Sequence, residues 1–541
     1  MPKLPIRNLG GAGVNTDVDP FNLPQNAFSR ANNVRFDEGS IKRSPVFRAV
    51  KDSLGFNPRF SLGISAATTG FDSCVMVAND WVIKEYSNDV VTDRSGSITG
   101  SDDPRAFTGS ILSEIVYVNR EDRRPVYRTA GGTNFADLPN WDANWRAKSL
   151  RVFQGFVLAL ATTESLTEFP TRVRWSNQVT GNNYPDSWDA TDTTKLAGFN
   201  DITEMSTPIV DGHNLRNNFV IYSEDECYLM EFIGGSFIFN FRKLFSHTGV
   251  INQNCVVEHE GRHYVFGPKD IYVHDGSTVQ SLADGRVRKF IYDSLNLSAS
   301  TVCFTTLNEE LNEVYFCFQS GDADASFPNA NRCNRAAVYN YRSNTWSFMD
   351  LPNVSSSAMM NLNSVLAYAS PRAATLQYDE AGGSYFDQQD SQNSHLVMVG
   401  EDNSTDGITS DKLYGIDLAD NGSIGYPLDT EATKSAMVER IGIDLDEAGI
   451  ELSGYKVIRA IYPQINTSNS DKTVCFTFGA ANTPNAAPSY EAVVNFNMAN
   501  EHKVDSRAAG RYLSYKVHDL NNYKDITFSG FDLDVAITGR R

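Results

Sequence analysis

Hydrophobic and polar residues alternate along much of the middle of this chain, in short runs separated by turns. One theme occurs three times between residues 217 and 352: two alternating apolar runs joined by residues rich in Gly, Asp or Asn. Its copies begin at Asn218, Arg262 and Glu313. Such alternation over about four to eight residues is typical of a half-buried strand, and the joining residues tolerate tight reversals. A hairpin that recurs in this way predicts radial repetition, as in the blades of a β-propeller.

The same pattern extends upstream of the three copies. The run Cys74–Tyr86 predicts a hairpin across Asn79 and Asp80, and Glu114–Val118 with Pro125–Arg128 predicts another pair. Units are spaced by about forty to sixty-five residues, which predicts about five to seven blades. The best helix candidate is Ala283–Leu295, where apolar residues are three or four apart.

These patterns predict an all-β fold in four parts. Residues 1–50 are dense in Gly and Pro, which break regular structure, and predict an extended docking arm. Residues 51–390 predict an irregular β-propeller. Residues 391–435 are polar and predict loops or a junction, and residues 436–541 carry enough strands for a small β-sandwich or barrel.

Composition and charge narrow the possible functions. The chain has 541 residues, 11% of them aromatic, and a formal net charge of −19. An acidic chain is poorly suited to gripping nucleic acid, because phosphate contacts need clustered Lys and Arg. It suits the lining of a conduit through which DNA slides, although such a charge also serves solubility alone.

The predicted arm differs from the rest of the chain because it is locally basic. Arg35 and Phe36 are expected on a short strand that turns at Asp37–Gly39. Five of its basic side chains are candidate docking residues for an acidic neighbour: Arg7, Arg30, Arg35, Lys42 and Arg43.

Cysteine usage and hydropathy indicate where the protein is made. Seven cysteines are scattered without a CxxC pair, so neither a disulfide framework nor a zinc site is expected, and we interpret them as buried thiols of a reducing cytoplasm. Neither a signal peptide nor a membrane span is expected, because the amino terminus lacks an apolar segment and no eighteen apolar residues run together.

The sequence motifs that could indicate catalysis or metal binding are only partial matches. His259–His263 matches the zinc-protease pattern HExxH, but that chemistry needs a helix, and here strand-like runs flank a central Gly. Asp402–Gly407 resembles the first half of a calcium loop, yet Leu413 stands where a bidentate Glu is required. Carboxylate clusters are interpreted as solvated turns. We therefore expect no catalytic residue, no metal and no cofactor, and no enzymatic activity.

Short motifs at both ends and in the centre are the most distinctive parts of the chain. The motifs are Gly10–Asn15, Ala31–Phe36, Arg43–Pro45, Val173–Ser176, Phe266–Gly276, Arg286–Arg288, Gly510–Tyr512 and Phe528–Asp534. Together they resemble tail nozzle proteins of short-tailed phages, also called tail hub or packaged-DNA-stabilising proteins.

This resemblance implies a structural virion protein that is assembled in the host cytoplasm and located in the tail. It implies a propeller-bearing subunit of a homo-oligomeric ring of about six copies, placed below the portal and an adaptor or head-to-tail connector protein, with tail fibres as possible further partners. Packaged double-stranded DNA would occupy the lumen without sequence specificity and be released on ejection. Two alternatives stay open, a propeller that binds or hydrolyses glycans and a cellular propeller scaffold.

Overall fold

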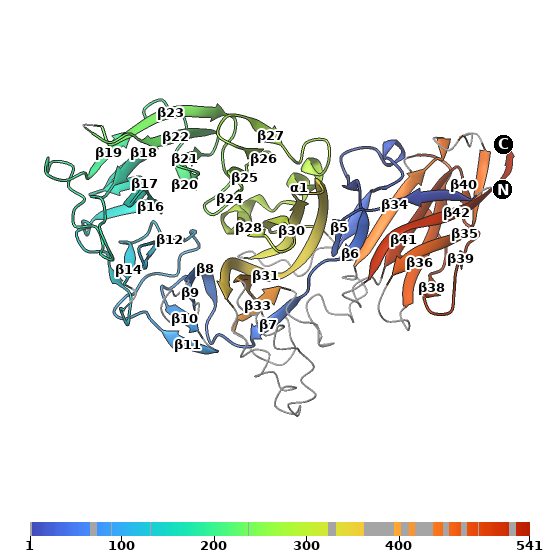
Figure 1. Cartoon of the computed structure of the whole chain (residues 1–541), viewed down its shortest axis with the longest axis horizontal. Coiled ribbons are helices and arrows are strands. Elements are labelled where there is room, and N and C mark those ends of the chain that lie inside the picture. Colours follow the sequence, from blue (N-terminus) through green and yellow to red (C-terminus); the bar gives the residue numbers. More distant parts are fainter. Residues whose placement is uncertain are drawn as a thin grey trace.

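The chain forms a ring of β-sheets joined on one side to a β-sandwich, with both termini at the far end of the sandwich (Figure 1). This computed structural model describes residues 3–64, 73–87, 89–129, 131–235, 237–322, 332–361, 394–401, 410–416, 436–446, 449, 454–466, 473–484, 486–518 and 526–540.

Five sheets of four antiparallel strands follow one another around the ring as blades 1 to 5, each with its first strand innermost. Blade 1 comprises β8 (Pro58–Ile64), β9 (Ser73–Ala78), β10 (Ile83–Ser87) and β11 (Val90–Asp93). Blade 2 comprises β12 (Thr108–Leu112), β13 (Ile115–Asn119), β14 (Val126–Arg128) and β15 (Ala136–Asp137). Blade 3 comprises β16 (Trp145–Phe153), β17 (Phe156–Glu164), β18 (Thr167–Trp175) and β19 (Gly198–Asp201). Blade 4 comprises β20 (Ile209–Leu215), β21 (Asn218–Ser223), β22 (Glu226–Phe232) and β23 (Phe239–Ser246). Blade 5 comprises β24 (Val256–His259), β25 (Arg262–Phe266), β26 (Ile271–His274) and β27 (Val279–Ser281).

A seven-stranded sheet completes the ring as blades 6 and 7. Its strands, in spatial order, are β28 (Phe304–Asn308), β29 (Glu313–Phe318), β30 (Cys333–Asn340), β31 (Thr345–Asn361), β32 (Ser394–Gly400), β33 (Lys412–Ile416) and β7 (Phe47–Lys51). The long β31 pairs first with β30 and, from Val354 onward, with β32, so one strand serves two blades. The early strand β7 pairs with β33 and closes the ring between the two ends of the propeller. The irregular β-propeller predicted from the sequence therefore has seven blades.

The predicted hairpins are the two central strands of the blades. Residues 115–119 of β13, 313–318 of β29 and 73–78 of β9 are buried at every position. Central strands are covered on both faces by neighbouring blades, which explains their nearly continuous apolar runs. The predicted helix is confirmed only as the seven-residue α1 (Arg288–Ser294), preceded by a tight turn and followed by the 3-10 helix η2 (Leu297–Val302).

Two sheets form the sandwich, and each contains strands from both ends of the chain. One sheet comprises β1 (Leu4–Arg7), β5 (Val34–Asp37), β6 (Ser40–Arg43), β35 (Gly454–Asn466), β39 (Val504–Asp505), β40 (Ala509–Gly510) and β42 (Thr527–Arg540). The other comprises β4 (Arg30–Asn32), β34 (Met437–Ile443), β36 (Thr473–Ala481), β37 (Ser489–Tyr490), β38 (Val494–Asn497) and β41 (Tyr512–His518). Between β1 and β4 in the sequence lie a short parallel pair, β2 (Gly13–Val14) and β3 (Ala27–Phe28), and the 3-10 helix η1 (Pro20–Asn22).

The predicted boundaries of the arm need correction. Residues 4–43 are not a separate arm, because β1, β4 and the β5–β6 hairpin pair with β42 and β34 of the carboxyl-terminal region. The turn expected at Asp37–Gly39 is confirmed, and Gly39 supplies its left-handed conformation with φ +75°. Backbone hydrogen bonding by the sheets, not the local Gly and Pro content, decides the structure of this segment.

The junction predicted at residues 391–435 also needs correction in the segments that the structure describes. Residues 394–400 and 412–416 are strands β32 and β33 of blade 7, so the propeller extends to residue 416. Their partners are β31 and the distant β7, a pairing that local polarity does not reveal.

Propeller and sandwich share one hydrophobic core. It joins Phe28 and Phe36 of the first segment, Trp346 and Phe348 of β31, and Tyr515 of the sandwich, all of them buried. Polar contacts cross the same boundary, since Asn33 donates its backbone N–H to the Phe348 carbonyl at 2.8 Å. Shared burial of large aromatic side chains holds the two parts as one body. Among the described residues, no helix is long and apolar enough to cross a membrane.

Candidate functional site

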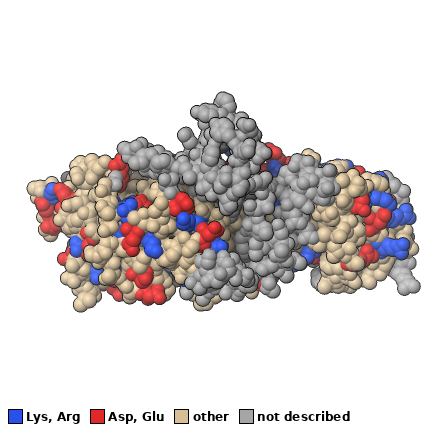
Figure 2. Space-filling model, turned by 90° about the horizontal axis from the view of Figure 1, so that it is seen from below, with Lys and Arg blue, Asp and Glu red and all other residues tan. Residues whose placement is uncertain are grey.

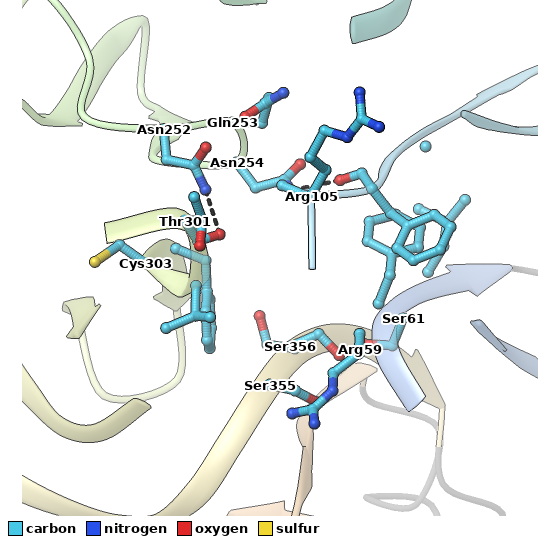
Figure 3. A pocket seen from close by; sticks show the side chains of 18 of the residues that line it. Arg59, Ser61, Arg105, Asn252, Gln253, Asn254, Thr301, Cys303, Ser355 and Ser356 are labelled. Carbon is cyan, nitrogen blue, oxygen red and sulfur yellow. Dashed lines mark hydrogen bonds between the residues drawn. The ribbon is translucent and has the colours of Figure 1, made fainter. Parts of the chain in front are cut away.

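A cavity with a volume of about 210 Å³ lies on the propeller axis. Its walls come from the residues at or just before the starts of the inner strands β8, β12, β24 and β28, and from the second half of β31. Figure 3 shows Asn252, Gln253 and Asn254 facing Ser355, Ser356 and Arg59 across the cavity. Arg151 of β16 lines the cavity as well, so six blades contribute to one space.

One wall is held together by a buried carboxylate on β20. Asp211 accepts hydrogen bonds from the Arg151 guanidinium at 2.5 and 2.8 Å, from the Ser149 hydroxyl at 2.6 Å and from the Asn254 backbone N–H at 2.9 Å. Arg151 also donates to the carbonyl of Gly109 at 3.1 Å. These contacts connect blades 2, 3, 4 and 5 around the axis.

The same contacts set the ionisation of Asp211. Burial by itself would raise the pKa of this carboxyl, but the charge and hydrogen bonds of Arg151, with those of Ser149 and Asn254, outweigh it, and the pKa lies below its ordinary value. A buried ion pair with all its hydrogen-bonding groups engaged gives a wall of fixed geometry.

A second buried ion pair lies near Arg59, a residue of the opposite wall, but does not itself line the cavity. Arg332 of blade 6 donates two hydrogen bonds to Asp411, at 2.6 and 2.8 Å, and both side chains are 3% exposed. Burial raises the pKa of Asp411 to about 6, although the Arg332 charge opposes this. Arg59 lies beside them, and burial, followed by the charge of Arg332, lowers the pKa of its guanidinium to about 10. Arg59 therefore stays charged at neutral pH in a poorly solvated place.

The lining contains three guanidinium side chains, from Arg59, Arg105 and Arg151, and no carboxylate. Sequence reasoning missed this site because the three residues come from three blades: Arg59 near the start of β8, Arg105 in a loop and Arg151 near the end of β16, and no local motif surrounds them. The sequence did contain one signal of this site. The inner strands β8, β12 and β20 carry Ser, Gly or Asp where the alternation would place an apolar residue.

The five basic residues predicted for docking lie in the sandwich and engage partners of the same chain. Arg7 contacts Asp532 at 2.6 Å, Arg30 lies 3.9 Å from Glu439, and Lys42 contacts Asp37 at 2.8 Å. Arg7 and Arg30 keep 46% and 42% of their side chains exposed.

The other two are more buried. Arg35 contacts Glu313 of blade 6 at 3.0 Å, across the boundary between sandwich and propeller, and Arg43 donates to the Ser44 carbonyl at 2.9 Å. The structure does not gather the five into one patch, and a docking role toward another protein stays a prediction.

The HExxH match lies in a hairpin, as the sequence predicted. His259 ends β24, Glu260 and Gly261 form the turn with positive φ, and His263 lies in β25, where it pairs with Glu258. His263 is buried and hydrogen-bonded to Tyr222, so it is a core residue. No group of three His, Cys, Asp or Glu residues that could hold a metal occurs within the described ranges. The calcium-like segment Asp402–Gly407 lies outside the described residues.

Comparisons with known proteins add only structural likeness. No family model matches the chain, and no curated protein matches its sequence. Similar solved structures include "Structure of U3-55K" (10% identity, TM-score 0.35), "Crystal structure of RRP9 WD40 repeats" (9%, 0.35) and "Crystal structure of WD40 beta propeller domain of Doa1" (12%, 0.36). Each match covers 69% of this chain and 98%, 99% and 95% of the respective structure.

Proposed function

We propose that this chain is a structural subunit of a phage tail, the nozzle that retains the packaged genome below the portal and opens for ejection. The observation that carries the proposal is where the family-like motifs lie. Those from the first 45 residues and those from the last 32 meet in one sandwich, in which β1 pairs with β42 and β4 with β34. The motifs from the two ends of the chain thus meet in one structural unit, whereas the central motifs lie in the propeller.

The shared core supports a mechanical role. A sandwich fused to a propeller through buried aromatic residues is a rigid, elongated body, which suits a ring subunit that must withstand the pressure of packaged DNA. Several copies would assemble around a common axis, with an adaptor or connector above them.

The size of the axial cavity bears on where DNA would pass in such a nozzle. A sphere of 210 Å³ is about 7 Å across, whereas the major groove of a duplex alone is about 12 Å wide. The propeller axis therefore does not admit a duplex, and the lumen of a nozzle has to lie between copies of the chain.

The charge of the chain suits the passage of DNA better than tight binding of DNA. The net charge is −19, and on the described part of the face in Figure 2 acidic and basic side chains are interspersed rather than separated into one large basic patch. Weak repulsion of phosphate would keep a duplex mobile in a lumen of this kind.

A stop codon early in the gene, in the source phage, tests the role. We expect particles that package DNA but lose it before infection, visible as empty heads by electron microscopy. Particles that stay full yet fail to attach to host cells would contradict the nozzle and favour the glycan-binding alternative.

A further inference from the structure

One hairpin of blade 4 carries large apolar side chains at its tip. Strands β22 and β23, at the top of the ring in Figure 1, are joined through residues 232–239, a run of eight that contains no charged residue. Phe232, Ile233 and Phe237 are 42%, 57% and 77% exposed. Single apolar residues are normal on a protein surface, but three large ones on one turn form a patch that marks an interaction site.

The base of this hairpin is held firmly by blade 3. Phe232 pairs with Phe239, and their ring centroids lie 5.8 Å apart. Phe239 is buried and contacts Trp175 of β18 with a centroid distance of 5.1 Å. The turn also closes on its own backbone, because the Ile233 N–H donates to the Ile238 carbonyl at 3.1 Å. The exposed side chains therefore project from a fixed support.

The length of the apolar tip suits the interfacial layer of a membrane. A strand rises about 3.3 Å per residue, so the two or three residues beyond the Phe232–Phe239 pair extend roughly 7–10 Å. Apolar groups of proteins that lie on a membrane enter about 5–10 Å into the boundary between headgroups and acyl chains. The nearest charged residues on the two strands are Glu231 and Arg242, which lie 3.6 Å apart behind the tip. They would meet the headgroups.

The size of the patch favours a lipid surface over a second protein. At about 200 Å² for each large side chain, the exposed fractions of Phe232, Ile233 and Phe237 amount to roughly 350 Å². A specific protein–protein interface takes about 800 Å² from each partner and surrounds its apolar centre with a hydrogen-bonding rim. Insertion into lipid needs neither, because each apolar side chain that leaves water contributes by itself.

We propose that the β22–β23 tip inserts Phe232, Ile233 and Phe237 into the interfacial layer of a zwitterionic lipid surface. The attraction is hydrophobic and not electrostatic, because the tip carries no basic residue and the net charge of −19 repels anionic headgroups. The hairpin lies in the surface and does not span it. This inference does not depend on the nozzle role.

Flotation of the full chain with phosphatidylcholine vesicles tests the proposal. The wild type should float with the vesicles, and high salt should not release it, because salt screens charges and leaves apolar insertion intact. Vesicles of equal parts phosphatidylcholine and phosphatidylglycerol should bind it no better. Failure to float with phosphatidylcholine, or binding that is confined to the anionic vesicles and lost at high salt, would overturn the proposal.

Substitutions then assign the binding to this hairpin. Phe237→Asp should lower the affinity for the vesicles about tenfold or more, because a carboxylate is costly to move into the apolar boundary. The matched control Leu166→Asp changes a side chain that is 97% exposed at the tip of the β17–β18 hairpin, between Glu164 and Glu168, and should leave the affinity unchanged. Both positions are exposed, so both variants should unfold at the temperature of the wild type. Unchanged affinity in Phe237→Asp, or an equal loss in Leu166→Asp, would overturn the assignment.

Sedimentation velocity without lipid separates a lipid surface from a second copy of the chain as the occupant. The wild type and Phe237→Asp should sediment alike. Wild-type oligomers that Phe237→Asp dissociates would overturn the lipid proposal in favour of a contact between copies. The stop-codon mutant decides the nozzle role separately, because its readout is the retention of packaged DNA.

Discussion

Acid should destabilise the propeller through a buried hydrogen-bond chain between blades 4 and 5. Tyr222 Oη lies 2.7 Å from His263 Nδ1 and 2.6 Å from His274 Nε2, and His263 Nε2 lies 2.7 Å from the Asn214 carbonyl. The carbonyl accepts only, so His263 Nε2 carries the proton and Nδ1 accepts from the Tyr222 hydroxyl. Tyr222 then accepts from His274 Nε2–H, and His274 Nδ1 accepts from the Gly276 N–H at 3.3 Å.

Every hydrogen bond in this series is consistent with neutral histidines, and a proton added to either imidazole ring would have no acceptor. Burial lowers the pKa of His274 to about 4, and it lowers that of His263 well below the ordinary value, with the neighbouring His213 and His274 adding to the effect. Around them lie Asp275, which opposes the shift of His274, and the buried Tyr272.

The sign and the size follow from proton linkage. The unfolded chain takes up a proton at His274 near pH 6.5, whereas the folded chain does so near pH 4, so stability present above pH 6.5 is lost as the pH falls toward 4. His274 alone accounts for about 2 kcal/mol at pH 5 and about 3 kcal/mol at pH 4. His263 acts in the same direction.

Urea unfolding followed by tryptophan fluorescence at pH 7.5 and pH 5 measures this loss in the wild type and in His274→Gln. Glutamine keeps an N–H donor toward Tyr222 but does not titrate, so the variant should lose less stability on acidification. The control His247→Gln removes a histidine whose side chain is 86% exposed and should behave as the wild type does. Equal acid losses in the wild type and His274→Gln would refute the reasoning.

Three further predictions concern how the ring and the sandwich are held. Gly63→Ala would place a Cβ 1.8 Å from the Met359 carbonyl oxygen where β8 meets β31, and should cost about 2 kcal/mol or more, whereas Gly131→Ala meets nothing within 4 Å. Thermal unfolding compares the two, and equal midpoints would contradict close packing at this seam. Asp411→Ala leaves Arg332 buried without its carboxylate and should cost about 3–5 kcal/mol in urea unfolding, against about 1 kcal/mol or less for Asp89→Ala in the exposed Lys51 pair. Deletion of residues 1–43 removes four strands of the sandwich, so limited proteolysis should digest residues 436–541 rapidly. A protease-resistant fragment of that region would show that the early strands are dispensable.

The sequence was most informative where strands are buried on both faces. The repeated apolar runs gave the central hairpins β21–β22, β25–β26 and β29–β30 close to their observed bounds, because burial between two blades demands apolar residues at nearly every position. Inner strands such as β12, with the sequence TGSIL, border the axis and carry small or polar residues, so they resemble loops. For that reason, the sequence predicted only a range for the number of blades.

Long-range pairing explains the remaining differences. Arg7 meets Asp532 and β7 meets β33, contacts between segments that are hundreds of residues apart, and no local pattern indicates them. The cavity is missed in the same way, since Arg59, Arg105 and Arg151 approach one another only when the ring closes. Local patterns predicted strands and turns, whereas the closure of the ring and the composition of the sandwich depend on which strands pair.

Gold-labelled antibody against this chain, applied to purified virions of the phage that the proposed function implies and viewed by negative-stain electron microscopy, tests the proposed role most directly. A tail nozzle predicts label at the distal tip of a short tail, in particles that have kept their DNA. Label that is absent from the virion, or confined to lateral fibres, would contradict the nozzle.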